Sequence, residues 1–349
     1  MPSDFDHYDY PLRRDRIAQE PLRQRSDARL LVVRRDSQTI EHRHVRDLPQ
    51  LLEAGDQLVL NDTRVVPARL IGHRTGTGGR WQGLFLSSAA TGHWKLLAKT
   101  RGKMAPGETV TLIDRLARDD TRLQLLTKSP EGVWTAKPES SEDPLQILER
   151  VGRVPLPHYI RGGEMVETDL RNYQTVFARR PGSVAAPTAG LHFTEELLRE
   201  LVQHEITPRW VTLHVGLDTF RPIKADSLEA HTMHREWAEI TTETVAALRA
   251  ARQEEQRIVA VGTTSVRVLE TAAAGGRLES WSGETDLFIR PPYRFRAVDA
   301  LLTNFHLPRT TLLILVRTFG GDKLVHAAYM EAIREQYRFY SYGDAMLIL

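Results

Sequence analysis

The chain has 349 residues, of which 41% are hydrophobic and 26% are charged, and its formal net charge is +2. This length and composition predict a folded protein with room for two domains and a substantial core. The absence of cysteine excludes disulfides, thiolate nucleophiles and cysteine-ligated metal sites. The first residues are polar and charged, and the longest apolar runs are too short to span a bilayer, so we expect a cytoplasmic enzyme.

Positive charge is concentrated in two segments of the chain. Residues 69–137 carry twelve Lys and Arg against five Asp and Glu, and residues 13–46 carry ten Arg against five acids. Each segment is either an ordinary solvated face or a surface that binds an anionic macromolecule. Composition alone does not choose between the two.

The N-terminal part predicts two short strands, at 29–33 and 56–62, with a short helix between them that ends at Gly55. Between residues 68 and 137, six short β-type segments are separated by turn sequences such as GTGG and SPEG. Six strands with short connections and no long helix are typical of a small antiparallel barrel or sandwich.

A helix is expected next, at 143–152, with Asp143 as its N-cap and Pro144 as its first residue. Beyond it, a buried strand at 257–261 leads through GTTS into a helix, and a further buried strand is expected at LLILV, 312–316. The chain ends on an apolar strand. One more strand is expected at 210–220, and three more helices are expected at 194–204, 241–256 and 264–276.

These elements predict a mixed α/β core with an inserted small antiparallel β-barrel domain. The core is expected to be discontinuous, formed by residues 1–67 and 150–349. The inserted six-stranded barrel is expected to span 68–149.

The sequence PGSVAAPTAGLHFT, residues 181–194, has no charged side chain. Its Gly and Ala residues give a surface without projecting side chains, while Ser183, Thr188 and His192 can form hydrogen bonds. Thr194 is the expected N-cap of the helix that follows. The segment is either a wall against a flat, uncharged ligand or a tight packing loop.

Several histidines have chemical potential. His214 lies between apolar residues of an expected strand, where a core histidine is the simpler interpretation. In EAHTMHREW, His231 and His234 would share a helix face and could bind a metal with Glu236 nearby. The HExxH pattern is missing, so general acid–base or hydrogen-bonding roles are favoured over a metal site.

Three further segments contain candidate binding residues. Gly262, Thr263 and Thr264 lie at a strand-to-helix turn, where they either hold a carboxylate or phosphate or simply cap the helix. The sequence VDALLTNFHLP places Asp299, Asn304 and His306 near one another along the chain. The Arg- and Tyr-rich sequences RPPYRFR and YRFYSY could stack nucleobases or serve as core aromatics.

Taken together, several sequences in this chain resemble the S-adenosylmethionine:tRNA ribosyltransferase-isomerase (QueA) family of queuosine biosynthesis. They run in the family's order from residue 9 to the last residue, and the family's fold is an α/β core interrupted by a small β-barrel. The chain departs from the family pattern at His158, Asp218 and Pro292, where the family usually has Pro, Gly and Gly. The resembling sequences are DYPL…RIAQEPL, LVLNDTRVVPARL, RVPLPHYI, PGSVAAPTAGLHFT, TLHVG…TFRPI, HTMHRE, VGTTSVRVLE, TDLFI, LLTNFHLPRTTLLILV and YRFYSYGDAMLIL.

The resemblance implies a transferase that moves and isomerises the ribosyl group of S-adenosylmethionine. The acceptor it implies is the aminomethyl-deazaguanine preQ1 at the wobble position of tRNA with a GUN anticodon. The products would be epoxyqueuosine-tRNA, adenine and methionine. S-adenosylmethionine would be a co-substrate, with no permanently bound cofactor and no metal. A base must take a proton next to the sulfonium, and adenine leaves more readily when it is protonated.

With this interpretation, candidate residues fall into three groups, and we expect a monomer. Catalytic roles are expected of His192, His214, His231, His234, Glu236 and His306. Substrate binding is expected of Ser183, Ala185, Thr188, Gly190, Gly262, Thr263, Thr264, Arg267, Asp299 and Asn304. RNA binding is expected of Arg13, Arg14, Arg34, Arg35, Lys99, Arg101, Lys103, Tyr293 and Arg294.

Three other classes remain open on the residues alone. A non-catalytic RNA-binding protein could use the barrel as its recognition module. A methyltransferase would share the co-substrate, although the Gly-rich loop expected after a first strand is missing. A histidine-ligated metallohydrolase is the third alternative.

Overall fold

The computed structural model describes residues 4–216 and 227–349. The chain divides into two compact units, which we call the core unit and the barrel unit. The core unit comprises Met1–Arg64, Pro157–Gly162 and Gln174–Leu349, and the barrel unit comprises Val65–Leu156 and Gly163–Tyr173. The predicted class, a mixed α/β core interrupted by an antiparallel barrel, is confirmed. The domain boundaries drawn at 68 and 149 stay a prediction.

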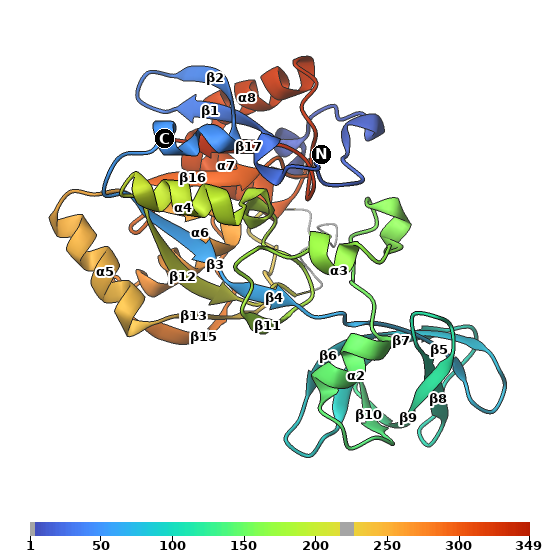
Figure 1. Ribbon diagram of the computed structural model, residues 1–349. Helices are drawn as coiled ribbons and strands as arrows, with labels where there is room; N and C mark the ends of the chain where they lie inside the picture. The colour runs from blue at the N-terminus through green and yellow to red at the C-terminus, as the bar shows by residue number, and fades with distance from the viewer. Residues whose placement is uncertain (1–3, 217–226) are drawn as a thin grey trace. The chain divides into compact units, whose positions relative to one another are not determined.

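The core unit is built on one nine-stranded mixed sheet (Figure 1). Strands β12, β3, β14 and β16 run parallel to one another in its centre. Strand β1 is parallel to β17, and the remaining neighbours pair antiparallel. In spatial order the strands are β15 (Trp281–Thr285), β13 (Glu236–Ile240), β12 (Thr207–Leu213), β3 (Gln57–Asn61), β14 (Ile258–Val261), β16 (Ala300–Asn304), β17 (Ala345–Ile348), β1 (Arg29–Arg34) and β2 (Thr39–His44).

The central strands of this sheet are buried on both faces, to which successive side chains along a strand point in alternation. On β14, Ile258 and Ala260 belong to one hydrophobic cluster, and Val259 and Val261 belong to another. The first cluster includes side chains of α5, α6, α7 and α8, and the second includes those of α4. This arrangement explains the almost continuous apolar runs of the central strands.

The helices and the shorter elements complete the two units. The helices are α1 (Leu48–Leu51), α2 (Pro144–Val151), α3 (Asp169–Asn172), α4 (Glu195–Gln203), α5 (Thr242–Gln253), α6 (Gly262–Ala272), α7 (Thr311–Gly320) and α8 (Asp322–Arg334). The 3-10 turns are η1 (Asp4–Tyr8), η2 (Arg14–Arg16), η3 (Arg25–Asp27), η4 (Val45–Asp47), η5 (Arg161–Gly163) and η6 (Thr188–His192). Two short strands, β4 (Thr63–Val65) and β11 (Arg180–Ser183), pair with each other.

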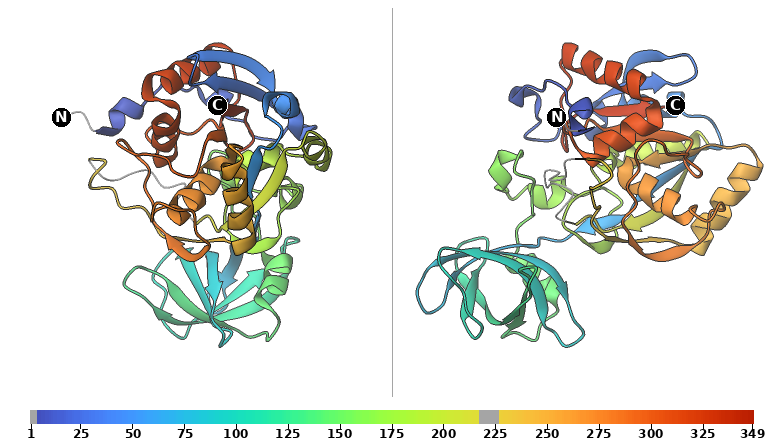
Figure 2. Two further views of the ribbon diagram at one scale, coloured as in Figure 1. Left: turned by 90° about the vertical axis from the view of Figure 1, so that its left-hand side faces the viewer. Right: turned by 180° about the vertical axis from the view of Figure 1, so that it is seen from behind.

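The barrel unit contains a closed six-stranded antiparallel barrel (Figure 2). Its interior holds three fully buried tryptophans, Trp81, Trp94 and Trp134. Asp143 caps α2 by accepting a hydrogen bond from the backbone N–H of Leu145, as the sequence predicts. The barrel strands, in chain order, are β5 (Arg69–Arg74), β6 (Arg80–Ser88), β7 (Trp94–Thr100), β8 (Thr109–Ile113), β9 (Asp119–Lys128) and β10 (Trp134–Pro138).

One predicted strand is wrong. The LLILV run at 312–316 lies in helix α7, not in a strand. The hydroxyl of Thr310 accepts a hydrogen bond from the backbone N–H of Leu313 and so begins the helix. A short apolar run does not distinguish a buried strand from a buried helix, and here the N-cap at Thr310 is the local feature that indicates a helix. Along the described part of the chain, no helix combines the length and apolarity needed to cross a membrane.

Candidate active site

A cavity in the core unit lies where three parallel strands end. Strand β12 is followed by Val215 and Gly216, β14 by Gly262, and β16 by Phe305 and His306, and all five residues line the cavity. The carboxyl ends of parallel strands meet at one edge of a sheet, and open α/β sheets commonly bind ligands there. The position of this cavity therefore follows from the topology of the sheet.

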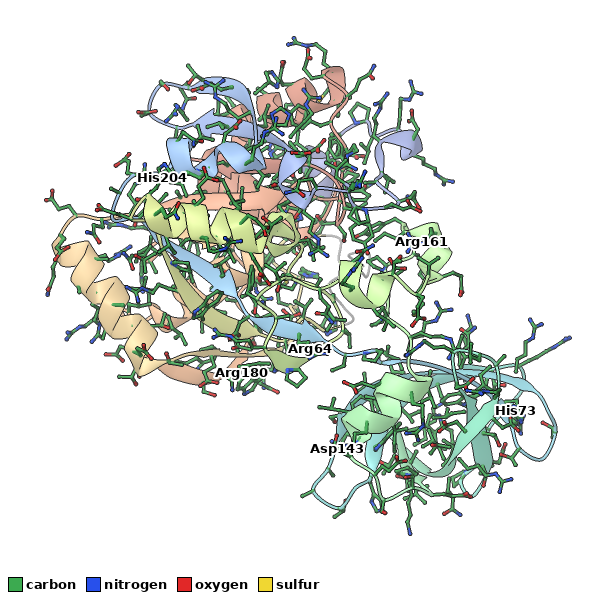
Figure 3. All side chains as sticks on the ribbon, viewed as in Figure 1. Arg64, His73, Asp143, Arg161, Arg180 and His204 are labelled. Atoms are coloured by element: carbon green, nitrogen blue, oxygen red, sulfur yellow. The ribbon has the colours of Figure 1, made fainter. Side chains whose placement is uncertain are left out.

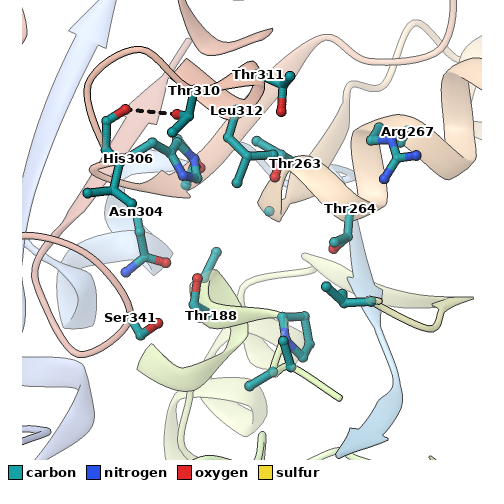
Figure 4. A pocket seen from close by; sticks show the side chains of 18 of the residues that line it. Thr188, Thr263, Thr264, Arg267, Asn304, His306, Thr310, Thr311, Leu312 and Ser341 are labelled. Carbon is teal, nitrogen blue, oxygen red and sulfur yellow. Dashed lines mark hydrogen bonds between the residues drawn. The ribbon is translucent and has the colours of Figure 1, made fainter. Parts of the chain in front are cut away.

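The uncharged segment at 181–194 forms one wall of the cavity. Residues 185–189 line it, including the first two residues of η6 and the side chain of Thr188 (Figure 4). Ser183 lies behind this wall, where its hydroxyl accepts from the N–H of Val215 at 2.9 Å and donates to the carbonyl of Ala185 at 2.6 Å. A Cβ at Gly190 would lie 2.9 Å from the Phe177 ring. Its outer residues therefore line the cavity and its other residues pack tightly behind them, while a flat, uncharged ligand against this wall stays a prediction.

Asn304 and His306 lie at one end of the cavity (Figure 4). The Asn304 side-chain amide donates to the carbonyl of Tyr340 at 3.0 Å and to Nε2 of His192 at 3.1 Å. Nε2 of His306 lies 2.8 Å from the Thr303 hydroxyl. Burial lowers the pKa of His306 to about 4, so its ring is neutral at neutral pH.

Three residues at this end, Tyr159, Tyr340 and Ser341, were not among the predicted site residues. The Tyr159 and Tyr340 rings lie 4.8 Å apart, and the Tyr159 hydroxyl lies 2.8 Å from the Ser341 hydroxyl. Tyr340 has a φ of 71°, an uncommon conformation for a bulky residue that is often found at functional sites. The YRFYSY run was the available signal, but its tyrosines were interpreted as base-stacking or core residues.

A buried ion pair between Glu236 and Arg267 lies on the cavity wall. Their side chains are only 6% and 5% exposed. The Glu236 carboxylate also accepts from the N–H of Gly216 at 2.8 Å, and Nε of Arg267 donates to the carbonyl of Leu287 at 3.2 Å. Because each charge has a partner, the pair adds polarity to the cavity without adding net charge.

Helix α6 begins at the same cavity. Gly262, Thr263 and Thr264 of its first turn line the cavity, and Gly262 has a φ of 85°. The N-cap residue, Val261, has an apolar side chain that cannot accept a hydrogen bond from the helix. The Thr264 hydroxyl is buried and has no hydrogen-bond partner within residues 4–216 and 227–349. This end of the cavity therefore suits an anion.

His231 and His234 line the cavity, but not from a helix. Residues 231–235 have no regular structure, and Glu236 is the first residue of β13. The His231 ring contacts Phe5 and Phe288 edge-on, and burial followed by the charge of His234 lowers the pKa of His231. In the portion of the chain that is described, no three His, Asp or Glu side chains are grouped to hold a metal.

The family model described as "Queuosine biosynthesis protein" matches residues 5–348 of this chain. The chain belongs to this family. An S-adenosylmethionine:tRNA ribosyltransferase-isomerase from Moorella thermoacetica is 47% identical over 349 residues, 99% of each chain. One from Symbiobacterium thermophilum is also 47% identical, over 98% of each chain. The crystal structure of an S-adenosylmethionine tRNA ribosyltransferase from Thermotoga maritima matches with a TM-score of 0.57 and 37% identity, covering 98% of this chain and 100% of that one.

In this member of the queuosine biosynthesis family, five predicted catalytic or substrate-binding residues do not line the cavity: Ser183 and Gly190, described above, and His192, His214 and Asp299. His192 is buried behind Asn304. Nδ1 of His214 lies 2.7 Å from the Thr63 hydroxyl, and the ring stacks on Trp237 at 5.0 Å. Burial and then the nearby charge of Arg180 (Figure 3) lower the pKa of His214.

Asp299 is the last of these residues, and it lies just before β16, away from the strand's carboxyl end. Its carboxylate accepts from the backbone N–H of Ile258 at 2.8 Å and lies 3.7 Å from the Arg252 guanidinium. These contacts tie the beginnings of β14 and β16 together. Asp299 and Asn304 are close in the sequence, but they lie at opposite ends of the short strand β16. The sequence alone did not show that only Asn304 reaches the cavity.

The predicted RNA-binding residues differ in their surroundings. Lys99, Arg101 and Lys103 are exposed on the barrel unit. Arg14 and Arg294 are exposed on the core unit. The others already have protein partners: Arg13 pairs with Asp15, Arg34 pairs with Glu41, Arg35 lies over the Phe319 ring, and the Tyr293 hydroxyl donates to Glu270.

The three departures from the family pattern lie away from the cavity lining or outside the described residues. His158 is exposed, with Nδ1 3.1 Å from the carbonyl of Gly162. Pro292 is also exposed. Asp218 lies outside the described residues.

Proposed function

We propose that this chain transfers and isomerises the ribosyl group of S-adenosylmethionine onto preQ1 at the wobble position of tRNA, releasing adenine and methionine. Relatives that are 47% identical over nearly the whole chain carry the name of this activity. The observation that carries the proposal is the cavity itself, which has a smooth, uncharged wall between two polar ends of different character. A flat nucleoside with a charged amino-acid tail matches this arrangement.

The two ends of the cavity suggest how S-adenosylmethionine lies in it. The carboxylate of the methionyl group would bind at the first turn of α6, near Thr263 and Thr264, where helix N–H groups favour an anion. The methionyl ammonium would lie near Glu236, and the positive charge of Arg267 would attract the methionyl carboxylate. The adenine would then lie at the other end, beside the neutral side chains of Asn304 and His306.

Ribosyl transfer requires proton transfer, for which the cavity has suitable groups. The sulfonium acidifies the adjacent ribose carbon, so that a base can remove a proton there. His231, His234 and His306 line the cavity, and the lowered pKa of His306 keeps its ring neutral near neutral pH. We propose that these three histidines, with Glu236, provide the acid–base and orienting groups of the reaction.

The wall residues Ala185 and Thr188 would contact the nucleoside directly. Ser183, Gly190 and His192 would support that surface from behind. A catalytic role of His214 is a proposal that the His214→Ala variant below tests, and substrate binding by Asp299 also stays a proposal.

For the RNA, we propose that the exposed cations of the barrel unit and the basic residues of 13–35 contact the tRNA backbone, with Tyr293 and Arg294 nearer the anticodon. The GUN anticodon specificity, a monomeric state and a cytoplasmic location are proposed with it. The exposure of Lys99, Arg101 and Lys103 supports a phosphate-binding role, because free cations can replace the counterions of the RNA.

The proposal is tested by incubating the full chain with S-adenosylmethionine and preQ1-containing tRNA. Release of adenine and methionine, with epoxyqueuosine in the digested tRNA, is the expected result. S-adenosylhomocysteine as the product would instead identify a methyltransferase. Tight tRNA binding without turnover would identify a non-catalytic RNA-binding protein.

A further inference from the structure

Asn304 presents an unusual buried acceptor to the cavity. It is the last residue of β16 and is only 2% exposed. Its side-chain oxygen, Oδ1, has no hydrogen-bond partner in the described structure, and solvent barely reaches it. Leaving such an acceptor unsatisfied destabilises the folded protein. A buried polar group of this kind calls for an explanation, and a ligand that supplies the missing donor is one.

The orientation of the Asn304 amide is fixed by its neighbours. One N–H donates to the carbonyl of Tyr340 and the other to Nε2 of His192, so Oδ1 is left on the cavity side (Figure 4). A flipped amide would place Oδ1 against the Tyr340 carbonyl, and two acceptors repel each other. Asn304 therefore offers the cavity an acceptor and no donor.

His192 stabilises this orientation without touching the cavity. Because Nε2 accepts from Asn304, the ring proton must be on Nδ1. Burial, followed by the charges of Arg338 and Arg25, lowers the pKa of His192 to about 3. The ring therefore stays neutral, and Nε2 stays an acceptor, at any pH near neutrality. We regard His192 as a positioning residue for Asn304.

The chemistry around Asn304 indicates which donor it receives. S-adenosylmethionine carries three kinds of donor: the 6-amino group of adenine, the ribose hydroxyls and the methionyl ammonium. Asn304 shares its end of the cavity with the uncharged side chains of Phe305, His306 and Tyr340, whereas Glu236 is the acidic residue among the described residues that line the cavity. An ammonium is better placed beside the carboxylate, and a hydroxyl, which can also accept, does not need a pure acceptor.

We infer that Oδ1 of Asn304 accepts a hydrogen bond from the 6-amino group of the adenine, and that the cavity thereby selects adenine over 6-oxopurines. The inference rests on the proposed function for the identity of the ligand. A 6-oxo group in the same position would place two acceptors against each other, with Asn304 held by Tyr340 and His192. Sites built to satisfy a buried polar group discriminate strongly against analogues that leave it unpaired.

The test compares the binding of S-adenosylhomocysteine and S-inosylhomocysteine to the full chain by titration calorimetry. The unchanged protein is expected to bind the 6-amino compound at least about 10-fold more tightly, and Asn304→Ala should reduce that ratio to about 2 or less. Asn172→Ala, a matched change in α3 of the barrel unit, should keep the ratio. Equal affinities in the unchanged protein, or an unchanged ratio in Asn304→Ala, would overturn the inference.

Two further variants address folding and the positioning role. His192→Leu removes the acceptor for Asn304 and should lower the ratio, while His192→Gln restores an acceptor and should recover most of it. If both variants keep the full ratio, His192 does not position Asn304, and the positioning role assigned to His192 is overturned. Turnover of preQ1-tRNA by the unchanged protein is measured separately. If the unchanged protein does not turn over preQ1-tRNA but shows the expected ratio of affinities, only the proposed function is contradicted. If it turns over preQ1-tRNA but binds both compounds equally tightly, only the inference is contradicted.

Discussion

The buried pair of Glu236 and Arg267 provides a quantitative test of how the cavity wall is held. In Arg267→Met, the Glu236 carboxylate stays buried and keeps the N–H of Gly216 but loses its charged partner. Breaking a buried ion pair by removing one partner typically costs about 3–5 kcal/mol. For a unit of roughly 250 residues, each kcal/mol corresponds to about 2–4 °C in the melting temperature. We therefore expect a decrease of about 6–20 °C in the transition of the core unit.

Scanning calorimetry measures this decrease, and two other variants complete the test. Glu236→Gln combined with Arg267→Met should be more stable than Arg267→Met alone, because the double variant no longer buries a carboxylate that has lost its arginine. Arg199→Met removes one partner of the exposed pair with Glu196 on α4, and it should melt close to the unchanged protein. If Arg267→Met melts within the range of Arg199→Met, the reasoning from burial is refuted.

Three further predictions follow from the site. Between about pH 6.5 and pH 4, the unfolded chain binds protons at His192 and His306 that the folded chain does not bind. The free energy of unfolding should therefore fall as the pH is lowered, by up to about 1.4 kcal/mol per pH unit for each of the two histidines. Urea titrations should show this fall, and His306→Gln should flatten it; a parallel pH profile would contradict the shift. Replacing the exposed cations of segment 99–103 with Ala should make the salt dependence of tRNA binding shallower by up to about 2–3 in log–log slope. An unchanged slope in fluorescence anisotropy would exclude this segment from the interface. Finally, His306→Ala should lower kcat more than His214→Ala, because only His306 lines the cavity; the reverse order in single-turnover kinetics would favour His214.

Elements with local signals were predicted well from the sequence. The barrel strands are marked by alternating apolar residues and by turn sequences between them, and both signals lie within a few residues of the element they define. The cap at Asp143 is equally local. The 312–316 run lacked such a signal in its own residues, and its identity as a helix depends on the hydroxyl of Thr310 just before it.

The residues that line the cavity were predicted in part, because the sequence gives the residue types but not the direction in which each side chain points. His214 and Asp299 follow or precede strands that reach the cavity, yet their side chains bind Thr63 and the backbone of Ile258 instead. Glu236 and Arg267 were assigned separate roles, and only the fold reveals that they pair across 31 positions of the chain. Tyr159 approaches Tyr340 from a distant segment, a contact for which the sequence carries no local mark.

The central claim is that the cavity donates the ribose of S-adenosylmethionine, and not its methyl group, to a tRNA base. The most direct measurement supplies S-adenosylmethionine labelled with 13C in the ribose in one reaction and in the methyl group in another, each with preQ1-tRNA and the full chain. Mass spectrometry of the digested tRNA should find the ribose label in the wobble nucleoside and the methyl label in free methionine. A wobble nucleoside of unchanged mass, or one that carries the methyl label, would contradict the account.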